Sequence, residues 1–442
     1  MIDNIVYLDD VVGRRIDPHQ FHPERIAIIE RIKKQSWCRL NDVIKNVKTI
    51  TSSIPNGETY IGLENIESNT GIYTPSDIET ISSAAKFKKG DILFPKLRPY
   101  LNKVHLAQFD GYCSTEFMIF EANNILPEFL TIILRSNIVV AQTKHLMTGN
   151  THPRLQPDDI ANLLIPYPNI EKQKEIIHIY QNAQNARLNK DNEATRLIAG
   201  IEDCIANKLQ LSTIRKGVEK RLPFTQKLSS LIGSRFDVPY HAGIKDAIRQ
   251  AEEAPYKALG EITVFSSEGW DQKSIFTDTF PYIEISSINT TVGCIEEISS
   301  VPVNKAPSRA KKIVRKDDIL ISTTRPNRGA ICIYNHNSIS IASTGFSVIR
   351  ETDNCVLREY LYLALRLSSS LEQMSLRCSG GNYPAITESE LKKILIPIPS
   401  ITIQENIIET VAKMRNKARQ LQEQGNQFME AVKHKIENII LG

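Results

Sequence analysis

Apolar positions recur with a helical period along one long stretch without proline, residues 171–211. They alternate in steps of three and four, which places them on one stripe of a helix. The same spacing returns over residues 402–441. Two such stripes predict two long helices that pack antiparallel as a coiled coil. We assign to the seam Ile176, Tyr180, Leu197 and Ile201 of the first helix, and Ile407, Val411, Met414, Leu421, Phe428 and Val432 of the second.

The residues before each long helix follow a different pattern. Short runs of loosely alternating apolar residues lie between Gly, Pro, Asn and Asp, which predicts the strands of a small α+β domain. One helical segment follows them in each half, over residues 126–147 and 357–376. Gly200 and Gly425 fall inside the predicted long helices, where each glycine costs about 1 kcal/mol relative to alanine.

The second half of the chain repeats the first. Arg98-Pro99 returns as Arg325-Pro326, and Gln173 returns as Gln404. The offset grows from 220 (235 − 15) through 227 (325 − 98) to 231 (404 − 173), as small loop insertions in a duplicated domain would make it. We therefore expect a pseudo-twofold tandem repeat of two globular domains separated by two long antiparallel helices. Its parts are residues 1–169, a helix and linker over 170–219, residues 220–399 and a helix over 400–442.

Composition narrows the class of protein. The 442 residues suffice for two domains, but the net charge is only +4, so any contact with nucleic acid must come from local basic patches. The seven cysteines are odd in number and form no C-x-x-C pair, which favours a reducing compartment and no metal site. The first residues lack the layout of a signal peptide, and the most apolar stretch is too short to span a bilayer. The prediction is a soluble cytoplasmic protein.

Signatures of catalysis are nearly absent. The chain has no G-x-x-x-x-G-K-[ST] loop and no H-E-x-x-H. The run Glu390-Leu391-Lys392 is a weak nuclease-like pattern where a helix is expected to begin. We interpret the chain as a non-enzyme without a cofactor or metal.

Basic residues cluster at matching places in the two halves, a pattern typical of phosphate contact. Arg98 and Arg325 each precede a proline, and the Gly-Asn loops offer polar groups of the kind that read base edges. The alternatives are a solvated surface, ion pairs that hold the loops, and a helix C-cap. The candidate contacts are Lys88, Lys89, Lys96, Arg98, Asn102, Lys103, Asn150, Thr151, His152 and Arg154, and in the second half Lys311, Lys312, Arg315, Arg325, Asn327, Arg328, Asn382 and Tyr383.

With its duplicated [GD]-D-I-L run, the run 97–103, Ser114-Thr115-Glu116-Phe117 and two Ile-Pro-x-Pro endings, the chain resembles the specificity subunit of type I restriction-modification enzymes. The resemblance implies two target recognition domains, each reading one half of a split, asymmetric site in double-stranded DNA. It also implies no activity of its own. The partners would be two adenine methyltransferase subunits, which would dock on the helices, and endonuclease or translocase subunits.

The second half departs from this pattern at three places. Asp317 stands for Gly90, Gly345 stands for Glu116, and no Leu-Asn-Lys follows Arg325-Pro326. The two halves are thus similar but not identical, as two heads that read unrelated half-sites would be. The alternatives are the recognition subunit of a two-subunit type II restriction system, a scaffold whose heads bind protein, and an unrecognised nuclease.

Overall fold

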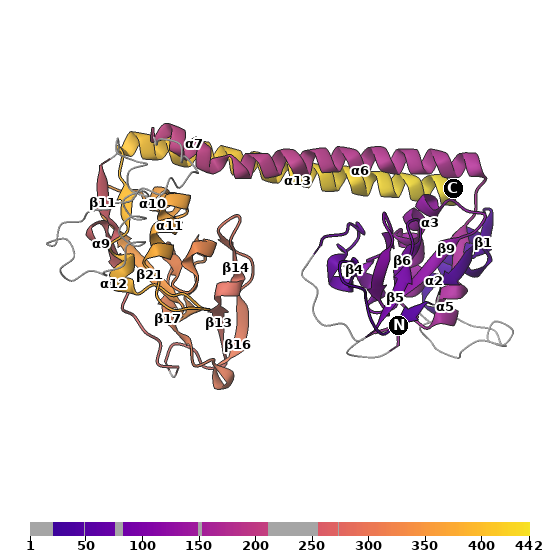
Figure 1. Ribbon diagram of the computed structural model, residues 1–442, viewed down its shortest axis with the longest axis horizontal. Helices are drawn as coiled ribbons and strands as arrows, with labels where there is room; N and C mark the ends of the chain where they lie inside the picture. Colours follow the sequence, from indigo (N-terminus) through magenta and orange to yellow (C-terminus); the bar gives the residue numbers. More distant parts are fainter. Residues whose placement is uncertain (1–20, 48, 76–82, 149–152, 211–254, 273) are drawn as a thin grey trace. The chain divides into compact units, whose positions relative to one another are not determined.

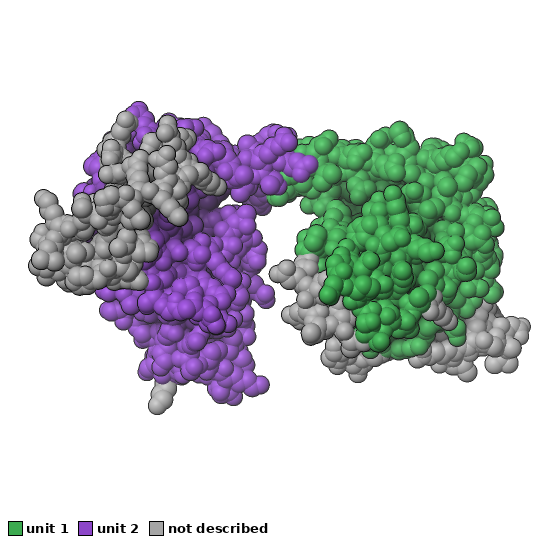
Figure 2. Space-filling view, in the orientation of Figure 1, with its two compact units in different colours: residues 1–191, 422–442 green, residues 192–421 purple. Residues whose placement is uncertain are grey.

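The computed structural model describes residues 21–47, 49–75, 83–148, 153–210, 255–272 and 274–442. The chain forms two compact units, which are coloured separately in Figure 2. Unit 1 comprises residues 1–191 and 422–442, and unit 2 comprises residues 192–421. Within the described residues, no helix is long and apolar enough to cross a membrane.

Unit 1 contains two four-stranded sheets (Figure 1). One is antiparallel throughout, in the order β2-β9-β6-β7. The other has the order β3-β5-β8-β4, and its β4–β8 pair is parallel. The strands are β1 (Trp37–Arg39), which pairs with β10 (Leu164–Pro166), β2 (Ile44–Val47), β3 (Ile50–Thr51), β4 (Tyr60–Ile61), β5 (Ala84–Phe87), β6 (Ile92–Pro95), β7 (His105–Leu106), β8 (Gly111–Ser114) and β9 (Phe117–Ala122).

The helices of unit 1 complete its core. Phe120 of β9 and Phe129 of α3 are fully buried in the same cluster as Ile176 of the first long helix and Ile436 of the last one. The all-apolar strand β6 is buried along its whole length, so it reads as a continuous apolar run. The helices are α2 (Pro23–Lys33), α3 (Pro127–Leu134), α4 (Asn137–Thr143), α5 (Pro157–Ala161) and α6 (Ile170–Ala199), with the short 3-10 helices η2 (Leu40–Asp42), η3 (Leu63–Asn65) and η4 (Pro99–Leu101).

Unit 2 repeats this plan. Its antiparallel sheet β12-β21-β18-β19 corresponds to β2-β9-β6-β7, and its β13–β20 pair is again parallel. The strands are β11 (Tyr256–Ala258), β12 (Thr263–Phe265), β13 (Thr279–Ile283), β14 (Ile288–Asn289), β15 (Cys294–Ile295), β16 (Ser299–Pro302), β17 (Ala310–Val314), β18 (Ile319–Ser322), β19 (Ile331–Ile333), β20 (Ser340–Ser343), β21 (Phe346–Thr352) and β22 (Leu395–Pro397).

The two units differ at the edge of one sheet. The inner order β5-β8-β4 of unit 1 matches β17-β20-β13 of unit 2, but the fourth strand joins the opposite end. It is β3, beside β5, in unit 1 and β16, beside β13, in unit 2. The helices of unit 2 are α7 (Ile201–Lys208), α9 (Leu259–Ile262), α10 (Arg358–Leu365), α11 (Ser368–Leu376), α12 (Glu388–Leu391) and the first part of α13 (Ile401–Leu441), with η6 (Ile285–Ser287), η7 (Val303–Lys305) and η8 (Pro326–Arg328). From residue 422 on, α13 belongs to unit 1.

The two glycines predicted to weaken the long helices behave differently. The first helix is interrupted at Gly200, so two helices, α6 and α7, stand where the sequence predicted a single one. The last helix, α13, continues through Gly425. A Cβ at Gly425 would lie 3.3 Å from Cγ of Arg187, so glycine there permits the close approach of α6 in unit 1. Each helical segment predicted before the long helices is likewise divided, into α3 and α4 and into α10 and α11.

Of the ten residues assigned to the helix seam, five are buried and four are half-buried, but one assignment is wrong. Ile176, Tyr180, Ile407, Val411 and Leu421 are buried, and Leu197, Ile201, Met414 and Val432 are half-buried. The side chain of Phe428 is 46% exposed, whereas the adjacent Met429 is buried in the core of unit 1. A straight helix drifts by about 20° per heptad relative to a 3.5-residue repeat, so a strict heptad selects the wrong neighbour after several turns.

Candidate nucleic-acid interface

Two arginines occupy matching turns in the two units. Arg98 directly precedes η4, and Arg325 directly precedes η8. Both are in the left-handed region, with φ and ψ of 47° and 54° for Arg98 and of 48° and 51° for Arg325. This conformation costs an L-residue about 1–2 kcal/mol. Residues held in such a conformation cluster at functional sites, so both arginines are candidates for a functional role.

The structure brings these turns together with the Gly-Asn loops, which the sequence suggested as separate candidates. The backbone N–H of Arg98 donates to the carbonyl of Pro153, and that of Arg325 donates to the carbonyl of Pro384, each at 2.8 Å. Asn150, Thr151 and His152 lie outside the described residues. The turn at Arg98 with residues 153–154, and the turn at Arg325 with residues 382–385, therefore form one surface in each unit, which we call the Arg–Pro surface.

In unit 1 the Arg–Pro surface carries an ion pair. Nη2 and Nε of Arg154 donate to the carboxylate of Glu116 at 2.7 and 3.2 Å. This hydrogen bond holds the pKa of Glu116 below its usual value, so the carboxylate is ionised at neutral pH. Lys96 is half-buried and lowers the same pKa through its charge, and Arg98 is exposed. The pattern of basic residues did not identify Glu116 as a partner of Arg154.

In unit 2 the Arg–Pro surface carries a stacked pair instead. The guanidinium of Arg325 lies 4.5 Å from the centre of the Tyr383 ring, and its Nη2 donates to the carbonyl of Asn382 at 2.9 Å. Tyr383 is 71% exposed, and Asn327 and Arg328 on the same turn are also exposed. The ring of Tyr383 is thus presented to solvent, with the guanidinium of the half-buried Arg325 stacked on it, as in groups that stack on bases or bind phosphate.

A second basic turn recurs before β6 and β18. The backbone N–H of Lys88 donates to Asp91 at 2.7 Å, and that of Arg315 donates to Asp318 at 2.8 Å. Burial raises the pKa of both aspartates. The side chains of Lys88, Lys89 and Lys311 are exposed and that of Lys312 is half-buried, whereas the guanidinium of Arg315 pairs with Glu268 at 3.1 Å.

Two candidate contacts of the first half make hydrogen bonds within the protein. Asn102 is buried, and its side-chain amide donates to the carbonyl of Arg135 at 2.8 Å. Nζ of the half-buried Lys103 donates to the carbonyl of Leu63 at 2.8 Å. Both residues come from the basic run 97–103, but the end of η4 turns them inward. The burial of Asn102 speaks against its predicted contact with nucleic acid, whereas that contact stays a prediction for the half-buried Lys103.

The weak nuclease-like pattern is also structural. Glu390 pairs with Arg377 at 3.1 Å and with Lys393 at 2.6 Å, and Lys392 pairs with Glu388 at 2.9 Å. These ion pairs hold the first turn of α12 against α11. A catalytic carboxylate needs a free face for a metal or a water, so Glu390 is placed to hold the helix.

One group among the described residues has the composition of a metal site, namely His22, Glu24 and His145. The two imidazole rings are stacked, with centroids 3.6 Å apart and planes 13° from parallel. Lone pairs in stacked rings run parallel rather than converging on one point. Glu24 is also engaged by His145 at 3.0 Å and Lys144 at 3.5 Å. This arrangement stabilises the start of α2 and is not a preformed metal site.

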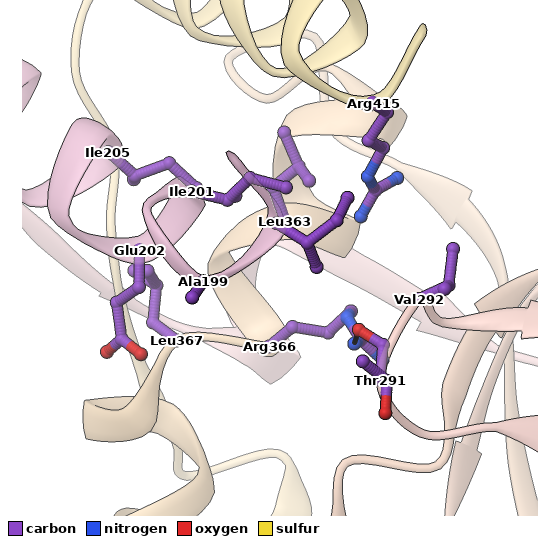
Figure 3. A pocket seen from close by; sticks show the side chains of 11 residues that line it. Ala199, Ile201, Glu202, Ile205, Thr291, Val292, Leu363, Arg366, Leu367 and Arg415 are labelled. Atoms are coloured by element: carbon purple, nitrogen blue, oxygen red, sulfur yellow. Dashed lines mark hydrogen bonds between the residues drawn. The ribbon is translucent and has the colours of Figure 1, made fainter. Parts of the chain in front are cut away.

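A pocket of about 160 Å³ lies in unit 2 between α7, α10 and the turn at Thr291 (Figure 3). Its charged lining residues are Glu202, Arg366 and Arg415, and burial lowers the pKa of Arg366. The guanidinium of Arg366 donates to four backbone carbonyls at 2.8–3.3 Å, those of Thr290, Thr291, Gly329 and Ile331. With its donors used within the protein, Arg366 joins the turn of β14 to η8 and offers little to a ligand.

Comparison with known proteins identifies the repeated unit. Residues 35–196 and 252–430 match the family model of the type I restriction modification DNA specificity domain. The specificity subunit of the type I restriction enzyme HindI of Haemophilus influenzae is 32% identical over 139 residues, 31% of this chain and 30% of that protein. The specificity subunit of EcoDI from Escherichia coli is 28% identical over 149 residues, 32% and 33% of the two chains. Each match thus spans about a third of the relative's length.

Two solved structures match the chain at low sequence identity. A chain from a type I R-M system, solved for its complex assembly and conformational transition, is 20% identical with a TM-score of 0.45, covering 91% of this chain and 96% of that one. The HsdS subunit from Thermoanaerobacter tengcongensis is 20% identical with a TM-score of 0.38, covering 92% and 96%.

Proposed function

Because the chain belongs to the type I restriction modification DNA specificity family, we propose that it is the DNA-reading, non-catalytic subunit of a restriction-modification complex. In this proposal, residues 1–169 and 220–399 are two target recognition domains, and each reads one half of an asymmetric site in double-stranded DNA. The observation that carries the proposal is the Arg–Pro surface, whose backbone recurs in both units while its side chains differ. A shared backbone that carries different side chains in the two units suits the reading of two unrelated half-sites.

The helices over 170–219 and 400–442 are proposed to form an antiparallel, pseudo-twofold spacer that sets the distance between the two half-sites. Contacts inside each unit support this. In unit 1, Nζ of Lys190 donates to Gln424 at 2.9 Å. In unit 2, Lys208 bonds to Asn406. As the residue number increases along the first helix, from 190 to 208, that of its partner decreases along the second, from 424 to 406. This order is the one expected of antiparallel helices.

The outer faces of the helices are the proposed docking surface for two adenine methyltransferase subunits in the cytoplasm. Leu188 and Phe428, both in unit 1, are 51% and 46% exposed although they are large and apolar. Exposed apolar side chains on a helix face suit a protein partner. Endonuclease or translocase subunits would join through the methyltransferases.

The test is to express the full chain with the methyltransferase of its own system and to sequence modified bases. We expect methylated adenine at one bipartite motif whose two halves differ. An absence of methylation with a folded complex, or methylation at a short continuous motif, would refute the proposal. Purified chain that cleaves DNA without a partner would favour an enzyme instead.

A further inference from the structure

The backbone of the Arg–Pro surface is the same in the two units, bond for bond. Three hydrogen bonds of unit 1 each have a counterpart in unit 2. The pairs are Lys96 N to Glu116 O (2.9 Å) with Thr323 N to Gly345 O (2.8 Å), Leu155 N to Lys96 O (3.1 Å) with Ile386 N to Thr323 O (2.9 Å), and Arg98 N to Pro153 O with Arg325 N to Pro384 O (both 2.8 Å). Glu116 therefore corresponds to Gly345, and Arg154 corresponds to Ala385.

The ion pair between Glu116 and Arg154 is lost completely at these corresponding positions. Gly345 and Ala385 have neither a carboxylate nor a guanidinium, yet unit 2 keeps every backbone bond just described. The pair is therefore not required to hold the loop. Arg98 and Arg325, in contrast, are the same residue in the same strained conformation in both units. A contact needed at any sequence, such as one to phosphate, suits the shared arginines, and a contact that specifies a base suits the pair that differs.

The ion pair has the donor and acceptor pattern of a base-pair reader. Glu116 engages the Nε and Nη2 side of Arg154, so Nη1 and the outer hydrogen of Nη2 remain for a second planar partner. In the major groove, guanine presents two acceptors, N7 and O6, and its cytosine presents the N4 amino donor. A guanidinium fork beside an ionised carboxylate matches those three groups in one plane.

We propose that Glu116 and Arg154 of unit 1 together recognise one G·C base pair in the major groove. Unit 2 has Gly345 and Ala385 at these positions and therefore does not recognise a base pair there. The inference rests on the proposed function. Arg154 binds the guanine edge, and Glu116 both orients Arg154 and accepts from the cytosine amino group. Half of Arg154 and almost a third of Glu116 are open to solvent, at 49% and 29% of their side-chain surface.

The experiment replaces the pair with the residues of unit 2, Glu116→Gly with Arg154→Ala, in the full chain expressed with its methyltransferase. Methylation rates are measured on duplexes that carry every base at each position of the motif. We expect the preference for G·C at one position of one half-site to fall roughly 10- to 100-fold, while the other half-site is unchanged. The control is Lys45→Ala with Glu121→Ala, which removes an exposed ion pair of unit 1 at 3.4 Å and should leave the motif intact.

A structural role for the pair would reduce methylation equally at all sequences, and that result overturns the inference. If the double variant does not fold, the single variant Arg154→Lys is tested in the same methylation assay, because lysine keeps the charge but lacks the planar guanidinium. The same loss of base preference is expected for it, and an unchanged motif refutes the reading. A wild-type chain that directs no bipartite methylation would instead refute the proposed function itself.

Discussion

Gln173 and Gln404 hold equivalent positions in the two units, 231 residues apart (404 − 173). Each lies in the first turn of a long helix and is buried. Oε1 of Gln173 accepts from the N–H of Leu126 at 3.0 Å, and its Nε2 donates to the carbonyl of Pro168 at 2.9 Å. Gln404 makes the same two contacts, with Leu357 at 2.8 Å and Pro399 at 2.9 Å. One side chain thus ties each long helix to the domain that precedes it.

Replacing Gln404 with alanine should lower the free energy of unfolding by about 2–3 kcal/mol, because the buried groups it satisfies lose their partners. The loss should appear in denaturant unfolding followed by circular dichroism. Gln420→Ala, on the same helix but exposed, is the control and should change stability by less than about 0.5 kcal/mol. Equal stability of the two variants would contradict the proposed anchoring role.

Replacing Arg98 with glycine should weaken DNA binding without weakening the fold. Glycine adopts a φ of 47° without strain, so the stability of the protein should be kept or slightly raised. If Arg98 contacts phosphate, affinity should fall to a similar extent for all sequences, and the slope of log affinity against log salt should become shallower by about one. A binding assay at several salt concentrations measures both. Lys413→Ala on α13 is the control, and equal loss in the control would contradict the prediction.

Asn102 provides the opposite case, since we assign it a structural role. Asn102 has φ of 51°, and the corresponding residue of unit 2 is Gly329, with φ of 71°. Asn102→Ala should therefore destabilise the protein by about 1–3 kcal/mol through strain and the lost hydrogen bond to Arg135. Asn102→Gly should recover the part due to strain. Thermal unfolding measures both, and a change in the DNA motif without a change in stability would show that Asn102 reads DNA after all.

The ion pair between Glu116 and Arg154 should make stability depend on pH in a defined direction. The hydrogen bond from Arg154 lowers the folded-state pKa of Glu116 below its ordinary value of 4.5. Its contribution is therefore present above that value and is lost as the pH falls through the lower, folded-state pKa. The difference in melting temperature between the wild type and Arg154→Ala should be constant near neutral pH and shrink under acid conditions. A difference that grows toward acid pH would contradict this assignment.

If the helices act as a spacer, lengthening both should move the half-sites apart. Inserting seven helical residues after Lys190 and seven before Gln424 leaves these two residues, which bond at 2.9 Å, opposite each other. Seven residues add about 10 Å of helix, equivalent to about three base pairs. Modified-base sequencing should show the same bases with a gap about three base pairs longer. Insertion into α6 alone misaligns the seam and should destabilise the protein, and an unchanged gap in the double insertion would refute the spacer.

The duplication made much of the fold predictable. An offset that drifts slowly requires two similar domains, and the duplicated [GD]-D-I-L run leads into a strand in both, β6 (Ile92–Pro95) and β18 (Ile319–Ser322). The pattern did not distinguish Gly200, which interrupts a helix, from Gly425, which does not. Gly425 packs against Cγ of Arg187 and Gly200 lies near Cε of Met414, each contact joining residues more than two hundred positions apart. Local propensity is the same for the two glycines, so it could not predict which of them interrupts a helix.

The candidate interface shows which features could be predicted from the sequence and which depended on the fold. The sequence alone determined that two α+β domains recur, that each is followed by a long helix, and that basic residues gather at the same place in both. Only the tertiary structure decided that Arg98 faces solvent while Asn102, four residues later, is buried against Arg135. It also brought Glu116 to Arg154, 38 residues away. The spacing of apolar residues over one or two turns is local, so it predicts which helices and strands form. The exposure and pairing of a polar side chain depend on residues that are distant in sequence and become neighbours only in the folded protein.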